Sequence, residues 1–131
     1  VGFARRALDE ALSRCKERRA FGRPIGEHQM IQAKLADMAT RVNAAAMLTY
    51  QAAWSADTGS PDAGASASMA KLFASEAACA VVDEALQIFG GMGVVSGTVV
   101  ERLYRHVRAF RIFDGTSEIQ KLIIAKHLLK T

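Results

Sequence analysis

The sequence predicts an all-α protein that folds as an up-and-down four-helix bundle. Apolar residues recur at steps of three and four over long segments, which places them on one face of a helix. Short loops marked by glycine or proline separate these segments, and only two prolines, Pro24 and Pro61, occur in 131 residues. No stretch alternates apolar and polar residues as a half-buried strand does. Long helices joined by short loops are typical of an up-and-down bundle.

The first two helices are expected over residues 1–17 and 27–57. Arg18 and Arg19 close the first, where basic residues suit the negative end of the helix dipole. Its expected inward face is Phe3, Ala7, Leu8, Ala11, Leu12 and Cys15. The inward face of the second is expected at Ile31, Leu35, Met38, Val42, Ala45 and Thr49. No capping residue precedes Val1, so we expect the first helix to begin upstream of this chain.

The third helix is expected over residues 61–89. Glycines at 90, 91 and 93 end it, because glycine readily adopts the positive φ of a helix C-cap. The inward face is expected at Met69, Leu72, Phe73, Ala77, Ala80, Val81 and Ile88. A short helix over residues 99–106 follows, with Thr98 and Glu101 spaced as a capping box. The last helix starts near Thr116, with its apolar stripe at Ile119, Leu122, Ile123 and Leu128.

Composition argues against several classes of protein. The net charge is +4, but Lys and Arg are scattered, which favours a solvated mixed surface over a nucleic-acid site. No apolar run looks long enough to span a bilayer, so no membrane partner is expected. Cys15 and Cys79 lie in apolar helical patterns and are expected to be buried free thiols in a reducing, intracellular setting. The sequence contains no cluster of Cys and His residues, so no metal site is expected.

Two groups of residues have the chemistry of a phosphate or ring site. Arg18 stands at a helix end before Phe21-Gly22 and His28-Gln29, and an arginine beside an aromatic residue can bind a phosphate and stack a ring. Residues 87–93, Gln-Ile-Phe-Gly-Gly-Met-Gly, would let a ligand approach the backbone closely. Taken alone, the first group is more typical of a helix-end charge with a core Phe, and the second of a glycine helix stop.

A third group, residues 111–120, starts the last helix. Asp114 and Glu118 suit the positive end of a helix dipole, and Thr116 or Ser117 can cap it. A carboxylate held beside free backbone N–H groups can also remove a proton, and the same groups can bind an oxyanion. The capping role and the functional role are equally compatible with the pattern.

The three groups together, with Ala7-Leu8-Asp9-Glu10-Ala11 and the Tyr104-Arg105 pair, resemble the C-terminal domain of acyl-CoA dehydrogenases over essentially all 131 residues. The resemblance implies an N-terminal helical domain and a central β-domain outside this chain. It implies noncovalent FAD, a homodimer or homotetramer, and oxidation of an acyl-CoA thioester to the trans-2-enoyl-CoA. Electron-transfer flavoprotein would accept the electrons, in the bacterial cytoplasm or the mitochondrial matrix. The isolated domain would be inactive.

The resemblance also assigns site residues. Arg18, Phe21 and Gln29 would contact the FAD pyrophosphate and adenine of a neighbouring subunit. Further FAD contacts would come from Gln87, Gly90, Gly91, Thr116 and Glu118. Gly115 would border the thioester, and Asp114 occupies the position of the base that removes the α-proton.

Asp114 is also where the sequence departs from the family, which usually has Glu there. Asp is one methylene shorter, and a misplacement on the order of 1 Å can cost about a hundredfold in rate. Some family branches place the base at the start of this domain's first helix, upstream of Val1. His106 is a second departure, since the family often has Asp there. Two alternatives remain: a same-superfamily flavin oxidase with an Asp base, resembling nitroalkane oxidase, and a non-catalytic helical assembly module.

Overall fold

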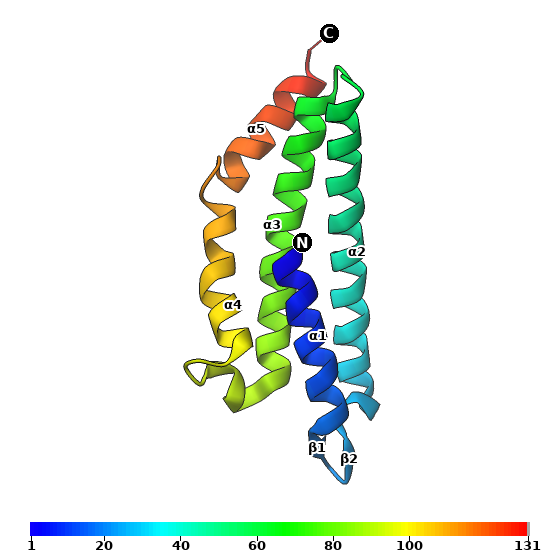
Figure 1. Cartoon of the computed structure of the whole chain (residues 1–131), viewed down its shortest axis with the longest axis vertical. Coiled ribbons are helices and arrows are strands. Elements are labelled where there is room, and N and C mark those ends of the chain that lie inside the picture. Colours follow the sequence, from blue (N-terminus) through cyan, green and yellow to red (C-terminus); the bar gives the residue numbers. More distant parts are fainter. Residues whose placement is uncertain (131) are drawn as a thin grey trace.

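The computed structural model describes residues 1–130, which form five α-helices and a two-stranded hairpin. The helices are α1 (Gly2–Glu17), α2 (Gln29–Asp57), α3 (Ala63–Phe89), α4 (Val99–Val107) and α5 (Ser117–Leu128). Strands β1 (Arg19–Ala20) and β2 (Arg23–Pro24) and the 3₁₀ turns η1 (Ile25–Glu27), η2 (Gly90–Val94) and η3 (Arg108–Arg111) connect them. α1, α2 and α3 run in alternating directions, and α4 and α5 return along α3 (Figure 1). The all-α up-and-down bundle is therefore confirmed.

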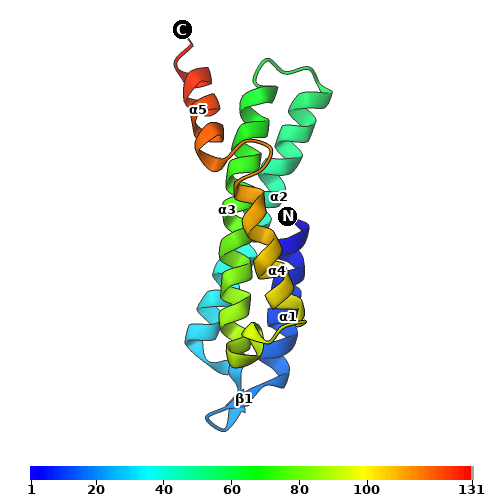
Figure 2. The same cartoon turned by 90° about the vertical axis from the view of Figure 1, so that its left-hand side faces the viewer.

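α3 is the central helix, since it contacts each of the other four. α1 and α4 pack on its second half and α5 on its first half (Figure 2). The apolar core combines α1, η1, the first half of α2, the second half of α3, and α4. Its largest fully buried side chains are Met38, Val81, Val82 and Val100. We call this half of the bundle, with β1–β2, the hairpin end, and the half formed by the second half of α2, the first half of α3 and α5 the α5 end.

The predicted faces of α1 and α2 are largely confirmed. α1 buries Ala4, Ala7, Ala11 and Cys15, and its small residues allow close approach to α3. Phe3 packs edge-on against Phe110, with ring centroids 5.0 Å apart. Two expected positions are wrong, since Leu12 and Thr49 are exposed.

Other predicted faces need correction at the α5 end. Met69 and Phe73 of α3 are exposed, as is the whole predicted stripe of α5: Ile119, Leu122, Ile123 and Leu128. α5 instead buries Ser117 and Gln120. Helical spacing identifies an apolar face but not the surface it meets, and α5 packs chiefly on one helix, α3.

The helix ends confirm two predicted caps and contradict a third. Gly90 ends α3 at φ 61°, and the Thr116 hydroxyl accepts a hydrogen bond from the Ile119 N–H (3.3 Å). The Thr98–Glu101 capping box is wrong. Within residues 1–130 the buried Thr98 hydroxyl has no hydrogen-bond partner, and Glu101 accepts from the Gly97 N–H (3.3 Å) while it pairs with Arg105.

One expectation about membranes also needs correction. The segment Ala63–Val94 reaches a mean hydropathy of 1.3 and is long enough to cross a bilayer. Core helices pass the same test of length and composition, and α3 contacts all four other helices, so this is weak evidence for a membrane span.

Both cysteines are free thiols, as predicted. Cys15 is buried, whereas Cys79 is only partly buried and lies 3.6 Å from the Val107 carbonyl oxygen. Burial raises the pKa of each thiol above its ordinary value.

Candidate functional site

A groove of about 1,220 Å³ lies at the hairpin end, between the β1–β2 hairpin, the start of α2 and the end of α3. It brings together the first two predicted groups of site residues, which lie far apart along the chain. The predicted residues that line it are Arg18, Phe21, Gln29, Gln87, Gly90 and Gly91.

The hairpin presents an aromatic side chain to solvent. Phe21 and Gly22 form its turn with φ of 52° and 82°, since a type I′ hairpin needs positive φ at both central residues. Phe21 is 95% exposed, and its ring meets His28 edge-on with centroids 5.9 Å apart. A fully exposed aromatic on a residue with unfavourable φ indicates a ligand-contacting role better than a core role.

His28 fixes the hairpin to the start of α2. Its Nε2 donates to the Ala20 carbonyl oxygen (3.1 Å), and its Nδ1 accepts from Arg23 (3.3 Å). Both contacts agree with a neutral imidazole protonated on Nε2. The hairpin that carries Phe21 is therefore tied to the base of the groove.

The glycines after α3 divide into two kinds. A Cβ at Gly90 or Gly91 would meet nothing within 4 Å, so both leave open space beside the groove. A Cβ at Gly93 would lie 2.4 Å from the Leu86 carbonyl oxygen, so this glycine serves the packing of η2 on α3. Gly90 and Gly91 therefore suit a ligand site, and Gly93 has a structural role.

Arg14 lines the groove but was missed by sequence reasoning. Its guanidinium lies over the Phe89 ring, 5.5 Å from the centroid. Its buried Nε has no hydrogen-bond partner in the described chain. Its position one helical turn before Arg18 was the available signal, since residues four apart share a helix face.

The remaining predicted residues form a turn at the α5 end. Asp114 and Gly115 are consecutive residues at positive φ, 53° and 84°. Asp114 is exposed and borders a cavity of about 270 Å³ whose other lining residues are mainly apolar. The other polar residues that line the cavity are Lys71 and Ser75. Its apolar lining residues are Val1, Phe3, Ala74, Ala78, Phe110 and Phe113.

α5 begins directly after this turn, with Thr116 as its cap. Glu118 is exposed in the first turn of α5. Hydrogen bonds from its own backbone amide and from the Thr116 hydroxyl lower the pKa of the Glu118 carboxyl.

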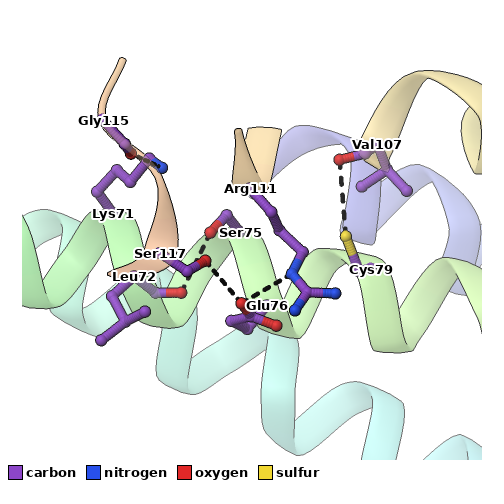
Figure 3. Close-up of polar contacts among 9 residues, drawn as sticks. All are labelled: Lys71, Leu72, Ser75, Glu76, Cys79, Val107, Arg111, Gly115 and Ser117. Carbon is purple, nitrogen blue, oxygen red and sulfur yellow. Dashed lines mark hydrogen bonds and ion pairs between the residues drawn. The ribbon is translucent and has the colours of Figure 1, made fainter. Parts of the chain in front are cut away.

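Polar contacts from α3 and α5 hold the turn. Lys71 Nζ donates to the Gly115 carbonyl oxygen. Gln120 Nε2 donates to the carbonyl oxygens of Asp114 (3.2 Å) and Gly115 (3.3 Å). Glu76 accepts hydrogen bonds from Arg111 and Ser117, on either side of the turn (Figure 3). Lys71 and Glu76 were not predicted as site residues, since nothing local marks them.

The two sets of site residues do not meet within this chain. None of Asp114, Gly115, Thr116 and Glu118 lines the groove at the hairpin end. The β1–β2 hairpin, which borders the groove, lies at one end of the long axis, and the turn before α5 lies nearer the other (Figure 1). The described chain therefore carries two separate candidate surfaces.

Comparison with known proteins identifies the family. Residues 1–129 match the family described as "Acyl-CoA dehydrogenase, C-terminal domain". The chain is 50% identical over 130 residues to 3-(aryl)acrylate reductase of Clostridium sporogenes, covering 99% of this chain and 34% of the relative. It is 49% identical over 131 residues to the human mitochondrial short-chain specific acyl-CoA dehydrogenase, covering 100% of this chain and 32% of the relative.

Solved structures share the fold. Butyryl-CoA dehydrogenase from Megasphaera elsdenii superimposes with a TM-score of 0.95 at 39% identity, over 98% of this chain and 33% of that one. A chain in the structure of the electron transferring flavoprotein of Acidaminococcus fermentans superimposes with a TM-score of 0.95 at 39% identity, over 99% of this chain and 34% of that one. The prolyl acyl carrier protein oxidase AnaB superimposes with a TM-score of 0.91 at 34% identity, over 96% of this chain and 33% of that one.

The chain spans about a third of the length of the relatives that it matches. The match in sequence extends over almost every residue, and the match in structure covers the same helices. The chain belongs to the acyl-CoA dehydrogenase family and corresponds to its C-terminal helical domain.

Proposed function

We propose that this chain is the C-terminal domain, residues 1–131, of a longer flavin-dependent acyl-CoA dehydrogenase. The proposed reaction converts an acyl-CoA thioester to its trans-2-enoyl-CoA. The observation that carries the proposal is Asp114, an exposed carboxylate on a left-handed turn at the edge of an apolar cavity. It occupies the position of the family's base, directly before Gly115 and the cap of α5.

The residues present fit a noncovalently held FAD. Arg18 can form charge-assisted hydrogen bonds to a pyrophosphate, and Phe21 can stack on the adenine. The open backbone at Gly90 and Gly91 allows close approach beside Gln87 and Gln29. Thr116 and Glu118 would contact FAD at the other surface. Because the two surfaces lie apart, we infer that they serve two different flavins in a homodimer or homotetramer.

In the reaction, the Asp114 carboxylate accepts the proton from the α-carbon of the thioester. FAD, when bound, supplies the acceptor for the β-hydride. The cavity beside Asp114 has a mainly apolar lining, which would limit water around the reacting carbon. The backbone of Gly115, the next residue, would border the thioester. Asp114 must be placed accurately, because its side chain is one methylene shorter than the usual Glu.

The wider assignments follow from the same proposal. Acyl-CoA is the substrate, and electron-transfer flavoprotein is the electron acceptor. The setting is the bacterial cytoplasm or the mitochondrial matrix. The chain alone should hold no FAD, because it contributes only two partial contact surfaces. Flavin absorbance at one per chain after purification of residues 1–131 would contradict this.

The test of the base uses Asp114→Asn in the full-length protein. Asn keeps the shape and the hydrogen-bonding capacity of Asp but not its basicity. The variant should retain FAD and bind butyryl-CoA, yet reduce its flavin about a hundredfold or more slowly in stopped-flow absorbance. Asp114→Glu should also be slower if the pocket is built for Asp. Near wild-type rates for both variants would place the base elsewhere, upstream of Val1.

A second candidate is a flavin oxidase of the same superfamily. Asp at the base position favours it, as does the structural match to a prolyl acyl carrier protein oxidase. An oxidase would consume oxygen as its flavin is reoxidised, whereas a dehydrogenase would need electron-transfer flavoprotein or an artificial acceptor. A full-length protein without flavin colour would instead favour a non-catalytic assembly module.

A further inference from the structure

The turn that carries Asp114 has one aromatic contact, the edge-on packing of Phe113 on Phe110 with ring centroids 5.1 Å apart, and is otherwise mostly exposed. Ile112, Phe113 and Asp114 are all exposed, and two consecutive residues have positive φ. Such backbone costs on the order of 1–3 kcal/mol for a non-glycine residue and persists only where surrounding contacts determine it. Polar contacts must therefore supply much of the constraint.

A single carboxylate oxygen of α3 ties both ends of the turn. Arg111 Nε, at the end of η3, donates to Glu76 Oε1 at 2.7 Å. Ser117 Oγ, in the first residue of α5, donates to the same Oε1, also at 2.7 Å. Ser117 is 2% exposed, whereas the Glu76 side chain is 38% exposed, so the contact is partly buried; Figure 3 shows both hydrogen bonds to Glu76. Hydrogen bonds to an ionised carboxylate are about twice as strong as neutral ones.

A second charged residue of α3, the cation Lys71, holds the middle of the turn. Lys71 precedes Glu76 by five residues, and its ammonium donates to the carbonyl oxygen of Gly115, the residue after Asp114 (Figure 3). Lys71 and Asp114 both line the 270 Å³ cavity. The backbone on both sides of Asp114 is thus fixed to one helix, α3.

We infer that Glu76 and Lys71 are positioning residues for the Asp114 base. They act through the backbone of residues 111–117 and set the distance of the carboxylate from the cavity. The inference rests on the proposed function. A base one methylene shorter than usual is sensitive to such placement, because an error of about 1 Å can cost a hundredfold.

The test compares Glu76→Ala with Glu84→Ala in the full-length FAD-containing protein. Glu84 is a matched control: it lies on the same helix, its side chain is 37% exposed against 38% for Glu76, and it also pairs with a cation of another element, Lys34. With butyryl-CoA as the probe, Glu76→Ala should slow flavin reduction about 10- to 100-fold, with the Kd for butyryl-CoA within about threefold of wild type. Glu84→Ala should stay within about twofold. Equal rates for the two variants would overturn the inference.

Three further variants separate positioning from general destabilisation. Glu76→Gln keeps an acceptor oxygen and should recover part of the lost rate. Ser117→Ala removes one contact and leaves the Arg111 contact, so it should slow reduction several-fold, and it guards against a Glu76 variant that fails to fold. In an Asp114→Asn background, Glu76→Ala should cause no further slowing, because residues that act through one another are non-additive.

The two possible failures are distinguishable. Additive slowing in the double variant would mean that Glu76 does not act through Asp114, with the proposed base intact. A wild-type rate for Asp114→Asn alone would instead remove the base itself, and the positioning role with it.

Discussion

The two ends of the bundle bury different kinds of residue. The hairpin end buries Val, Ile and Met side chains, together with Ala and Cys, in one continuous cluster shared by α1, α2, α3 and α4. The α5 end buries mainly Ala and Ser, with Gln120, and its large apolar residues are exposed. α1 covers only the hairpin half of α2 and α3, so fewer helices enclose the other half (Figure 1).

This difference determines how each candidate surface is held. The groove at the hairpin end is a set of exposed side chains on helices that the apolar core already fixes. The Asp114 turn lies outside that core and is fixed by hydrogen bonds that Lys71 and Gln120 donate and that Glu76 accepts. The proposed cofactor contacts thus lie on helices fixed by the apolar core, whereas the proposed base depends on a polar network.

Two methionines of α2 give the largest expected contrast in stability. Met38 is 1% exposed at the hairpin end, and Met47 is 65% exposed at the α5 end. Met38→Ala should lower the free energy of unfolding by about 2–5 kcal/mol, because it leaves a cavity in the core. Met47→Ala should stay within about 0.5 kcal/mol. Urea unfolding of residues 1–131 followed by circular dichroism measures both, and equal losses would contradict the comparison.

Arg18→Ala in the full-length protein should affect FAD retention rather than folding. Arg18 is exposed at the end of α1 and lines the groove. Loss of a charge-assisted contact of about 1.5–3 kcal/mol corresponds to roughly 10- to 150-fold weaker binding. Lys16→Ala is the control, an exposed basic residue in the same helical turn. Fluorescence titration of apoprotein with FAD gives the Kd, and a sharp fall in apoprotein Tm with full flavin content would make Arg18 structural.

Two glycines with the same φ test the polar network at the α5 end. Gly22 has φ 82° with open space around a Cβ, and Gly115 has φ 84° with Gln120 Nε2 at 2.7 Å. Ala at either position should cost about 1–2 kcal/mol for the left-handed conformation. Gly115→Ala should cost about 1–3 kcal/mol more, because the buried Gln120 amide must shift and lose its partners. Equal Tm changes in residues 1–131 would show that the amide relocates freely.

Sequence reasoning predicted the fold and singled out residues that line the groove, because the signals for both are local. Helical spacing gives each helix, and Arg18, Phe21, Gly90 and Gly91 stand in short motifs that reach the groove. Sequence reasoning wrongly predicted that the apolar stripe of α5 is buried. Helical spacing does not reveal how many helices surround each half of the bundle. Sequence reasoning also missed Lys71 and Glu76, whose partners lie 35 to 44 residues away along the chain. Contacts at that separation follow from the packing of α5 on α3.

The exposed apolar side chains of the α5 end predict self-association of the chain. Leu122 and Ile123 on α5 and Trp54 on α2 are large apolar side chains that are exposed. Exposed apolar side chains in such number are typical of interaction surfaces, so residues 1–131 should associate at micromolar concentration. Leu122→Lys should weaken association about tenfold or more, the equivalent of about 1.4 kcal/mol. Met30→Lys, at an exposed methionine of the hairpin end, should have little effect. Sedimentation velocity across a concentration series measures both. A monodisperse monomer at micromolar concentration would mean that the exposed apolar side chains of the α5 end do not drive self-association.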